Sequence, residues 1–516
     1  MAMLALSPDF KRTRVWLQDR LWGSRGAEQG AGSLRQSLSE IRRSLGRDHS
    51  VLVTDRYVLS LERTLFDLDI EPSMTIAPGR ELLEGLDIGE EGFEDWLRLQ
   101  RQTINTVRGP PECSSSGPSP LGPAAPPQSC RPRVVLIGGE RPSDAGASPV
   151  ADSLIDSIAK SISELGAADI FDCRTNVPRE GAVEPWTDGA ALSLRSDIFT
   201  SPARQTLRLA LLQLPANALA WSSSLQFATK EGLDLSDPRV MLCINQVTNV
   251  AIDHFVKMCG ASSDRVAASA LCHSGILHLF RLGKLNFDAA DRLFASAFAV
   301  EQRGIFLAWR AYLRTFLLAE RQFTCRQTIE AEALEFIHRA LELDPHNSYV
   351  AALSAHVHAM MRRSYVAAYE LAERSLQLNH ANPIGWACLG IAKSYLGKTK
   401  EGYEDTLLAR SIAGSAPFRY QLDALSSIAG TIAGDLRSAI DLAEASHALA
   451  PTFAPPLRYL SALYAHDGRY ELSSEMVQKL RTTEPDFSYD KLRDKGYPAA
   501  GLHRTSIIQS LPRKQL

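Results

Sequence analysis

The sequence PIGWACLGIAKSYLG, residues 383–397, contains the pattern W-x-x-L-G at Trp386, Leu389 and Gly390. Leu449-Ala450-Pro451 and Thr483-Glu484-Pro485, which lie 34 residues apart, each read as the end of a helix. Leu343-Asp344-Pro345 ends an earlier helix in the same way. Small and aromatic residues recur at the matching positions of the last unit, at Leu460, Tyr464, Gly468 and Tyr470. Residue type and period therefore agree in several units, which predicts stacked pairs of antiparallel helices.

This period and these residue types resemble the tetratricopeptide repeat. The expected units are 271–304, 305–347, 348–382, 383–419, 420–453 and 454–487. A single helix pair cannot bury its apolar face alone, so neighbouring units stack into a superhelix with a concave surface. Such a groove usually binds a peptide or another protein, and the sequence does not identify which. The alternative is a helical bundle without repeats.

Strand signals dominate the region before the repeats. Strands are expected at 133–137, 169–173, 190–199, 205–214 and 218–228, with helices at 151–165 and 237–259. This order of elements predicts one mixed sheet with helices packed on it. Their succession resembles the TolB-amino-terminal-like domain, which in many bacterial regulators precedes tetratricopeptide repeats.

Residues 109–132, GPPECSSSGPSPLGPAAPPQSCRP, have no hydrophobic period. Proline, serine and glycine dominate this stretch, so it buries too little apolar surface to offset the entropy of ordering. It is predicted to be a linker that separates an amino-terminal module from the rest of the chain.

The amino-terminal module contains an amphipathic helix at 32–46. Leu34, Leu38, Ile41 and Leu45 form its apolar stripe. The opposite face carries Arg35, Gln36, Ser39, Arg42 and Arg43, whose donors and acceptors suit base edges and phosphates. The alternative interpretation is that this face is an ordinary solvent-exposed helix surface that binds no ligand.

A second amphipathic helix at 14–22 precedes this helix, and a β-hairpin is expected at 51–61. The segments LQDRLW (residues 17–22) and SLRQSLSEIRRSLG (residues 33–46) resemble the carboxyl half of the OmpR-type winged-helix domain. The resemblance is to the form of this domain found in SARP/BTAD-like regulators. The resemblance implies that the five polar residues face DNA and that Arg56 lies at the wing. Residues 66–108 resemble the start of the helical domain that follows in that family. Because the family's opening sheet and most of its first helix have no counterpart, Trp16, Leu21 and Leu38 are expected to be poorly covered.

The overall composition argues against a protein that binds or spans a membrane. A net charge of −3 argues against a polybasic membrane binder, although residues 1–47 carry an excess of arginine and lysine. No apolar run is long enough to cross a bilayer, and the eight cysteines are scattered without a C-x-x-C pair. The expected location is therefore the cytoplasm.

No pattern typical of a catalytic, metal or nucleotide site is found, so no enzyme activity, cofactor or metal is expected. Gly138-Gly139 lacks the rest of a phosphate loop, and the histidine spacings around Cys272 and His356 fit no tetrahedral metal site.

The predicted fold class is multidomain and mainly α: a partial winged helix, a mixed α/β middle domain and an α-helical repeat superhelix. The predicted division is 1–65 partial winged helix-turn-helix, 66–108 helical extension, 109–132 linker, 133–260 α/β domain, 261–487 tetratricopeptide repeats and 488–516 carboxyl-terminal tail. The first functional hypothesis is a transcriptional regulator that binds promoter DNA and recognises a protein or signal through its repeats. The alternative is an adaptor that binds proteins through the repeats and whose truncated DNA-binding domain is inactive.

Overall fold

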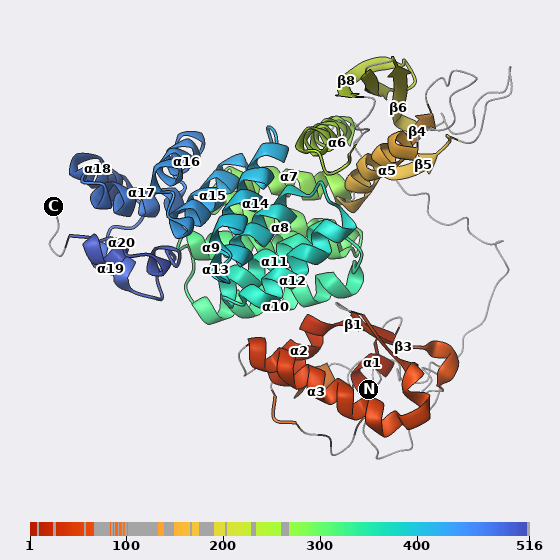
Figure 1. The fold of residues 1–516 in the computed structure, drawn as a ribbon, viewed down its shortest axis with the longest axis horizontal. Helices are drawn as coiled ribbons and strands as arrows, with labels where there is room; N and C mark the ends of the chain where they lie inside the picture. The colour runs from red at the N-terminus through yellow and green to blue at the C-terminus, as the bar shows by residue number, and fades with distance from the viewer. Residues whose placement is uncertain are drawn as a thin grey trace, which may run out of the picture. The chain divides into compact units, whose positions relative to one another are not determined.

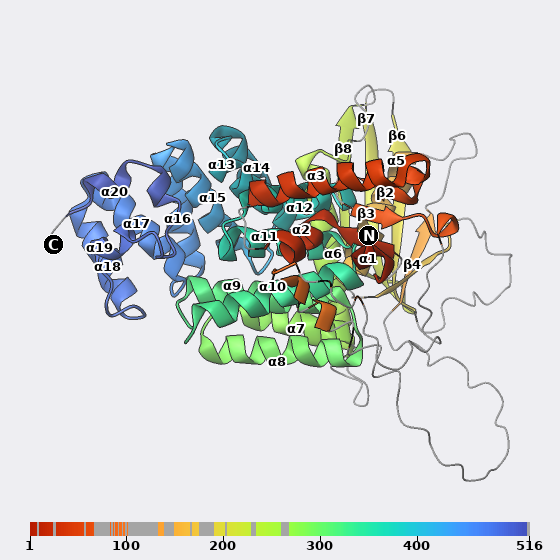
Figure 2. The same ribbon diagram turned by 90° about the horizontal axis from the view of Figure 1, so that it is seen from below.

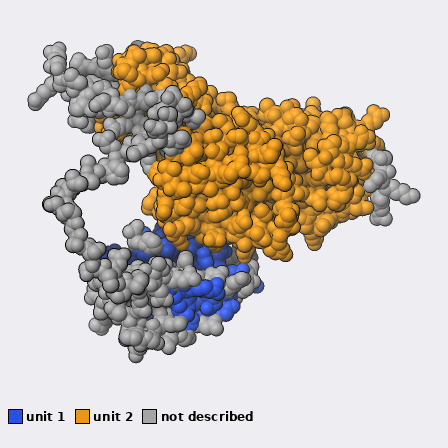
Figure 3. Space-filling model, turned by 180° about the vertical axis from the view of Figure 1, so that it is seen from behind, with its two compact units in different colours: residues 1–129 blue, residues 130–516 orange. Residues whose placement is uncertain are grey.

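The computed structural model divides the chain into two compact units, residues 1–129 and 130–516, which are described separately (Figure 3). In the first unit the described residues are 1–7, 10–23, 27–55, 58–66, 83, 86, 88–90, 92–94, 96–98 and 101. In the second they are 133–138, 149–165, 168–174, 190–201, 204–228, 234–259 and 268–512. The predicted linker 109–132 and the wing residue Arg56 lie outside the described residues.

The first unit combines helices with a small sheet. Its helices are α1 (Ala2–Ala5), α2 (Arg14–Trp22) and α3 (Ala27–Leu45), and its strands are β1 (Lys11–Thr13), β2 (Leu52–Thr54) and β3 (Val58–Leu61). The strands form an antiparallel sheet in the order β1-β3-β2. The sequence did not predict β1, because three polar residues give no hydrophobic alternation.

The apolar core of the first unit is well covered, so the expectation of poorly covered apolar residues is wrong for two of the three. Trp16 is 2% exposed and Leu38 is 6% exposed, while Leu21 is partly buried. Residues from the two ends of the unit complete the core: Met3, Leu4, Phe93, Trp96 and Leu97. The start of the chain and the stretch after the hairpin therefore supply part of the packing around this core.

The second unit begins with a five-stranded mixed sheet. Its strands are β4 (Arg133–Gly138), β5 (Asp169–Asp172), β6 (Ala190–Thr200), β7 (Arg204–Gln213) and β8 (Ala218–Ala228), in the order β5-β4-β6-β7-β8. β4 is parallel to β5 and β6, whereas β7 is antiparallel to both of its neighbours. Figure 2 shows β7 between β6 and β8.

Two helices cover one face of this sheet, α5 (Pro149–Glu164) and α6 (Pro238–Cys259). Alternate residues of the central strands, such as Leu192, Leu194 and Leu209, are fully buried against them. This alternation arises because successive side chains of a strand point to opposite faces of the sheet. The sides of α5 and α6 that face away from the sheet contact the helical repeats.

Six antiparallel helix pairs follow along the chain (Figure 1). They are α7 (Ala268–Phe280) with α8 (Lys284–Val300), α9 (Gly304–Ala319) with α10 (Arg326–Leu343), α11 (Ser348–Met361) with α12 (Tyr365–Leu378), α13 (Pro383–Tyr395) with α14 (Thr399–Ile412), α15 (Arg419–Ala433) with α16 (Leu436–Leu449), and α17 (Ala454–His466) with α18 (Tyr470–Arg481). These are TPR-like helical repeats.

The glycine of the W-x-x-L-G pattern permits close contact within one pair. A Cβ on Gly390 would lie 2.5 Å from the carbonyl oxygen of Gly402, on the facing helix α14. A side chain at either position would force α13 and α14 apart, which explains why small residues mark this place in the repeat.

The stretch predicted as a carboxyl-terminal tail is folded as far as residue 512. It contains α19 (Tyr489–Arg493), a short 3-10 turn at Leu502–Arg504 and α20 (Ile507–Ser510). Leu492 and Leu502 are fully buried in one core with α17 and α18. These residues cap the last helix pair, whose outer face would otherwise be open to solvent. In the part of the chain that the structure describes, no helix is long and apolar enough to cross a membrane.

Candidate interaction surfaces

The predicted DNA-reading residues lie on the exposed side of α3. Leu34 and Leu38 are buried on its other side. Arg35, Gln36, Ser39, Arg42 and Arg43 are all exposed to solvent. The structure thus brings five of the six predicted site residues onto one helix face, and Arg56 lies outside the described residues.

Three of these five side chains already form hydrogen bonds within the chain. Arg35 donates to the backbone carbonyl of Ala31 at 3.2 Å, and Gln36 donates to Glu40 at 3.0 Å. Arg42 donates to the Thr54 hydroxyl on β2, which ties the end of α3 to the sheet. Glu40 is exposed on the same helix and offsets part of the positive charge.

The inner face of the repeats is filled by the chain's own side chains. In α9 and α11, the first helices of the second and third pairs, nearly every residue is buried. A helix that is buried on nearly all sides lies inside a protein rather than along an open groove. At these helices, the concave surface that was expected to bind a peptide or another protein is therefore filled by the chain's own side chains.

An aromatic cluster closes this interior between units far apart in the sequence. The Phe280 ring lies 5.6 Å from the rings of both Phe316 and Phe418. The Tyr420 hydroxyl donates to the Phe280 carbonyl at 3.2 Å, across 140 positions. The first and second pairs therefore meet the start of α15 and the residue before it, which closes the superhelix on itself.

Hydrogen bonds support the same closure. The Tyr312 hydroxyl donates to the side-chain oxygen of Gln421 at 2.7 Å. The backbone amide of Ala454, at the start of α17, donates to the Glu320 carboxylate at 3.1 Å. Burial raises the pKa of Glu320 to about 7, and the nearby Arg458 charge only partly offsets this.

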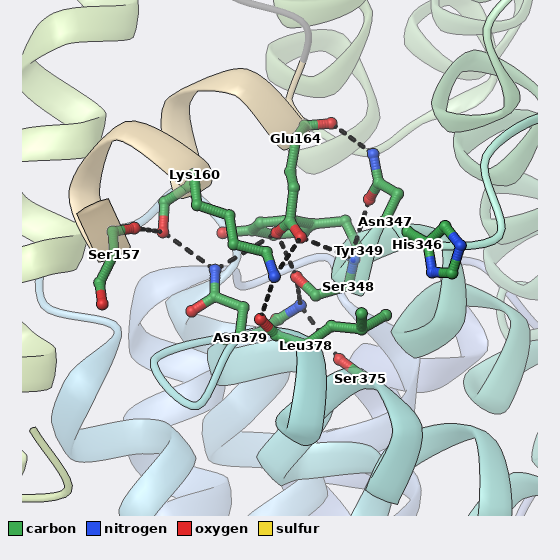
Figure 4. Close-up of polar contacts among 12 residues, drawn as sticks. Ser157, Lys160, Glu164, His346, Asn347, Ser348, Tyr349, Ser375, Leu378 and Asn379 are labelled. Carbon is green, nitrogen blue, oxygen red and sulfur yellow. Dashed lines mark hydrogen bonds and ion pairs between the residues drawn. The ribbon is translucent and has the colours of Figure 1, made fainter. Parts of the chain in front are cut away.

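One edge of the repeats is formed by the loops that join each helix pair to the next, and α5 docks on it. We call this edge the junction edge; its loops lie at 301–303, 344–347, 379–382, 413–418, 450–453 and 482–488. Glu164, the last residue of α5, accepts from the Ser348 amide at 3.1 Å and also from the Ser348 hydroxyl (Figure 4). The Asn347 side chain donates to the Glu164 carbonyl at 2.7 Å.

The same cluster reaches the next junction. Asn379 donates to the Ser161 hydroxyl at 2.9 Å and to the Glu164 carboxylate at 3.3 Å, and Lys160 donates to the Leu378 carbonyl (Figure 4). Burial raises the pKa of Glu164, while its bonds to Ser348 and Asn379 act in the opposite direction. One acidic residue thus joins the α/β region to two successive junctions.

The helix α6 continues this docking further along the edge. The Asn245 side chain donates to the Ala381 carbonyl at 2.9 Å and to the Ile412 carbonyl at 3.0 Å. Ile412 is the last residue of α14, where carbonyls lack intrahelical partners, and Ala381 lies in the loop before α13. The buried amide thus satisfies one carbonyl at each of two junctions that would otherwise be costly to bury. Gly414 lies against Leu242 of the same helix, since a Cβ there would be 3.2 Å from that side chain.

A small cavity of about 60 Å³ remains between α6 and the repeats. It is mainly apolar, and Cys272, Trp309 and Phe418 are among its lining residues. The indole nitrogen of Trp309 has no hydrogen-bond partner among the described residues. A volume of this size is that of a packing defect rather than of a site for a drug-sized ligand.

A larger groove of about 460 Å³ lies at the last two junctions, where neither α5 nor α6 docks. It is lined by His447, Ala448, Pro451, Thr452, Leu457, Lys479, Thr482 and Thr483. Leu449, beside it, is 60% exposed. Among the described residues, no group of histidine, cysteine or acidic side chains is arranged to hold a metal ion.

Sequence reasoning missed the closed interior and the docking of α5 and α6, although a signal for the first was present. The sequences GIFLAWRAYLRTFLLA and SYVAALSAHVHAMM are mostly apolar or small, with few charged residues besides Arg310 and Arg314, and this composition is typical of buried helices. No comparable signal marks Glu164, whose partners lie 184 and 215 positions away in sequence.

Comparison with protein-family models and with curated protein sequences gave no match. Among solved structures, the chain is similar to YrrB, described as a TPR protein with an unusual peptide-binding site (19% identity, 37% of this chain and 93% of that one, TM-score 0.24). It is also similar to the type IV pilus biogenesis factor PilW (18% identity, 39% and 89%, TM-score 0.29). A tetratricopeptide repeat protein from Parabacteroides merdae gives 12% identity over 53% of this chain and 97% of that one, with a TM-score of 0.31. The repeat architecture of this chain therefore rests on its own six helix pairs.

Proposed function

We propose that this chain is a non-enzymatic, cytoplasmic adaptor that binds a partner protein along the junction edge of its repeats. The observation that carries the proposal is the docking of α5 and α6 on the earlier junctions of the same edge. The chain's own helices α5 and α6 therefore show what kind of segment this edge can bind. It is a helix whose side-chain amides or carboxylates form hydrogen bonds with backbone groups at the junctions of the repeats.

The groove at the last two junctions is the proposed partner site. It presents the same kind of surface, formed where α16 and α18 end, but no described helix covers it. Thr452 and Thr482 are exposed on its rim, and Leu457 lies at its apolar floor. Lys479 lines the groove but is paired with Glu475 at 2.8 Å, so the groove offers a partner helix mainly its apolar floor and the hydroxyls of its threonines.

The test is co-purification of the full-length chain from its native source, with quantitative mass spectrometry of what remains bound. Thr452→Arg and Thr482→Arg place bulk in the groove, and the matched control is Thr324→Arg, an exposed threonine in the turn between α9 and α10. Partners that both groove variants lose and the control keeps would support the proposal. A bound set that is identical for all four proteins would exclude the groove.

A second candidate function is transcriptional regulation through α3. The specific observation in its favour is that Arg35, Gln36, Ser39, Arg42 and Arg43 are all exposed on a helix whose other face is buried. In this hypothesis α2, α3 and the β2–β3 hairpin act as a winged helix, with α3 in the major groove of promoter DNA.

Binding to promoter fragments at two salt concentrations tests this candidate. Phosphate contacts release counterions, so affinity should fall steeply as salt rises. Arg43→Ala should weaken sequence preference more than Arg35→Ala, because Arg35 is already bonded to its own helix. Binding that neither substitution changes would rule out α3 as the reading element.

A further inference from the structure

The strand β8 forms one edge of the five-stranded sheet and is unusually open for an edge. It runs for 11 residues, ALAWSSSLQFA, without a charged residue or a proline. Alternate residues such as Ser222, Ser224 and Gln226 are exposed. Long uncharged edges present free backbone donors and acceptors, and proteins normally protect such edges.

The opposite edge of the same sheet has that protection. β5 is only four residues long and has an aspartate at each end. Arg174, directly after it, donates to Asp172 at 2.6 Å and to Asp156 at 2.6 Å. One edge of this sheet is therefore short and charged, whereas the other is long and neutral.

The side of β8 that faces α6 is incompletely covered. Phe227 is buried, but Trp221 and Leu225 are only partly buried where they pack on the core. Cross-strand pairing places Trp221 opposite Leu211, and Leu225 opposite Leu207, on β7. No strand among the described residues lies on their other side to complete this coverage.

We propose that β8 pairs with β8 of a second copy of this chain, antiparallel and around a two-fold axis at Ser223. In this register Trp221 lies opposite Leu225 of the second copy, and Ser222 lies opposite its Ser224. Over residues 221–225, which follow the irregularity at Ala220, apolar residues thus meet apolar residues, serines meet serines, and no like charges face each other. Such self-complementarity is what a two-fold interface requires, and it favours a second copy over an unrelated peptide. The result is one continuous sheet through both copies.

The register gives a charge-swap test. The double substitution Ser222→Asp and Ser224→Asp places aspartates of the two copies opposite each other at the axis. Within one copy, Arg208 on β7 lies opposite position 224, so an aspartate there faces an opposite charge and the sheet is expected to stay folded. Ser222→Lys with Ser224→Asp differs at one position only and places a lysine opposite an aspartate on both sides of the axis. The mass of full-length protein is measured by light scattering and sedimentation over a range of concentrations, with circular dichroism to verify folding.

The wild-type chain should dimerise with concentration, the double-aspartate variant should be at least tenfold weaker, and the lysine–aspartate variant should recover dimerisation. The proposal is overturned if the wild type stays monomeric, or if both variants dimerise as the wild type does. It is also overturned if the lysine–aspartate variant is folded but as monomeric as the double-aspartate variant. A monomeric wild type whose β8 amides become protected from hydrogen exchange only on adding an extended peptide would assign the edge to a peptide instead.

Discussion

The Glu164 carboxylate accepts hydrogen bonds from both the backbone amide and the hydroxyl of Ser348, a residue 184 positions later in the chain. Ser348 is the first residue of α11, so the carboxylate satisfies an amide that has no intrahelical partner. The contact joins the helical layer of the α/β region to the middle of the repeats.

Replacing Glu164 by alanine should lower the free energy of unfolding by about 2–3 kcal/mol, because the amide and hydroxyl of Ser348 would remain buried without this acceptor. The measurement is urea unfolding of the full-length chain followed by tryptophan fluorescence. Glu335→Ala, at an exposed position of α10, is the matched control and should have little effect. Equal stability of the two variants would show that the contact does not hold the layers together.

Glu320 should make stability depend on pH. Its pKa is raised by burial to about 7, from an ordinary value of 4.5, so the folded chain keeps a proton that the unfolded chain loses between these values. The contribution of Glu320 to stability is therefore largest at low pH, falls as pH rises from about 4.5 to about 7, and then levels off. Urea titrations at pH 5 and pH 8 should show a smaller loss of stability for Glu320→Gln than for the wild type. A loss of equal size in both proteins would contradict this prediction.

Phe280→Ala should destabilise the closed interior strongly. The ring contacts Phe316, Phe418 and Tyr420 across the superhelix, and its loss leaves a cavity between units that are distant in sequence. A cost of about 3–5 kcal/mol is typical of a buried phenylalanine. The comparison is Leu285→Ala, since Leu285 is 85% exposed on α8 and should be nearly neutral. Similar melting temperatures for the two variants would mean that the interior is not closed in solution.

Arg458→Met should unfold the cap of the last helix pair. Arg458 is fully buried and donates to the Glu484 carboxylate at 3.0 Å, and Tyr497 also donates to that carboxylate at 2.5 Å. Removing the arginine weakens the pairing of a buried negative charge, which typically costs about 3–5 kcal/mol. Limited proteolysis should then cut within 488–512 much faster than in the wild type. The exposed Arg437→Met serves as the control, and unchanged cleavage in Arg458→Met would refute the capping role.

The sequence was sufficient for elements whose signal is local. The 34-residue period and the small residues at positions such as Gly390 predicted the helix pairs, because each pair is built from contacts between neighbouring segments. The strands β4 to β8 were predicted from runs of apolar residues separated by turn residues, and their mixed sheet from the order of elements. The amphipathic stripe at Leu34 and Leu38 likewise predicted which side of α3 is buried.

The parts that the sequence did not predict depend on contacts between distant positions. Phe280 and Tyr420 are 140 positions apart, and nothing near either residue indicates that they meet. The covering of Trp16 by Met3 and Trp96 was missed because the family resemblance pointed to absent elements rather than to substitutes. The function hypotheses share this limit, since exposed arginines on α3 suit DNA but also suit an ordinary helix surface.

The filled interior has a mechanical consequence. Open superhelices of stacked helix pairs behave as soft springs, which lengthen or coil as they wrap a ligand. Here the rings around Phe280 join the first two helix pairs to the start of α15, and α5 and α6 contact the loops along one side. A superhelix braced in this way resists stretching and coiling, so its surface keeps one shape.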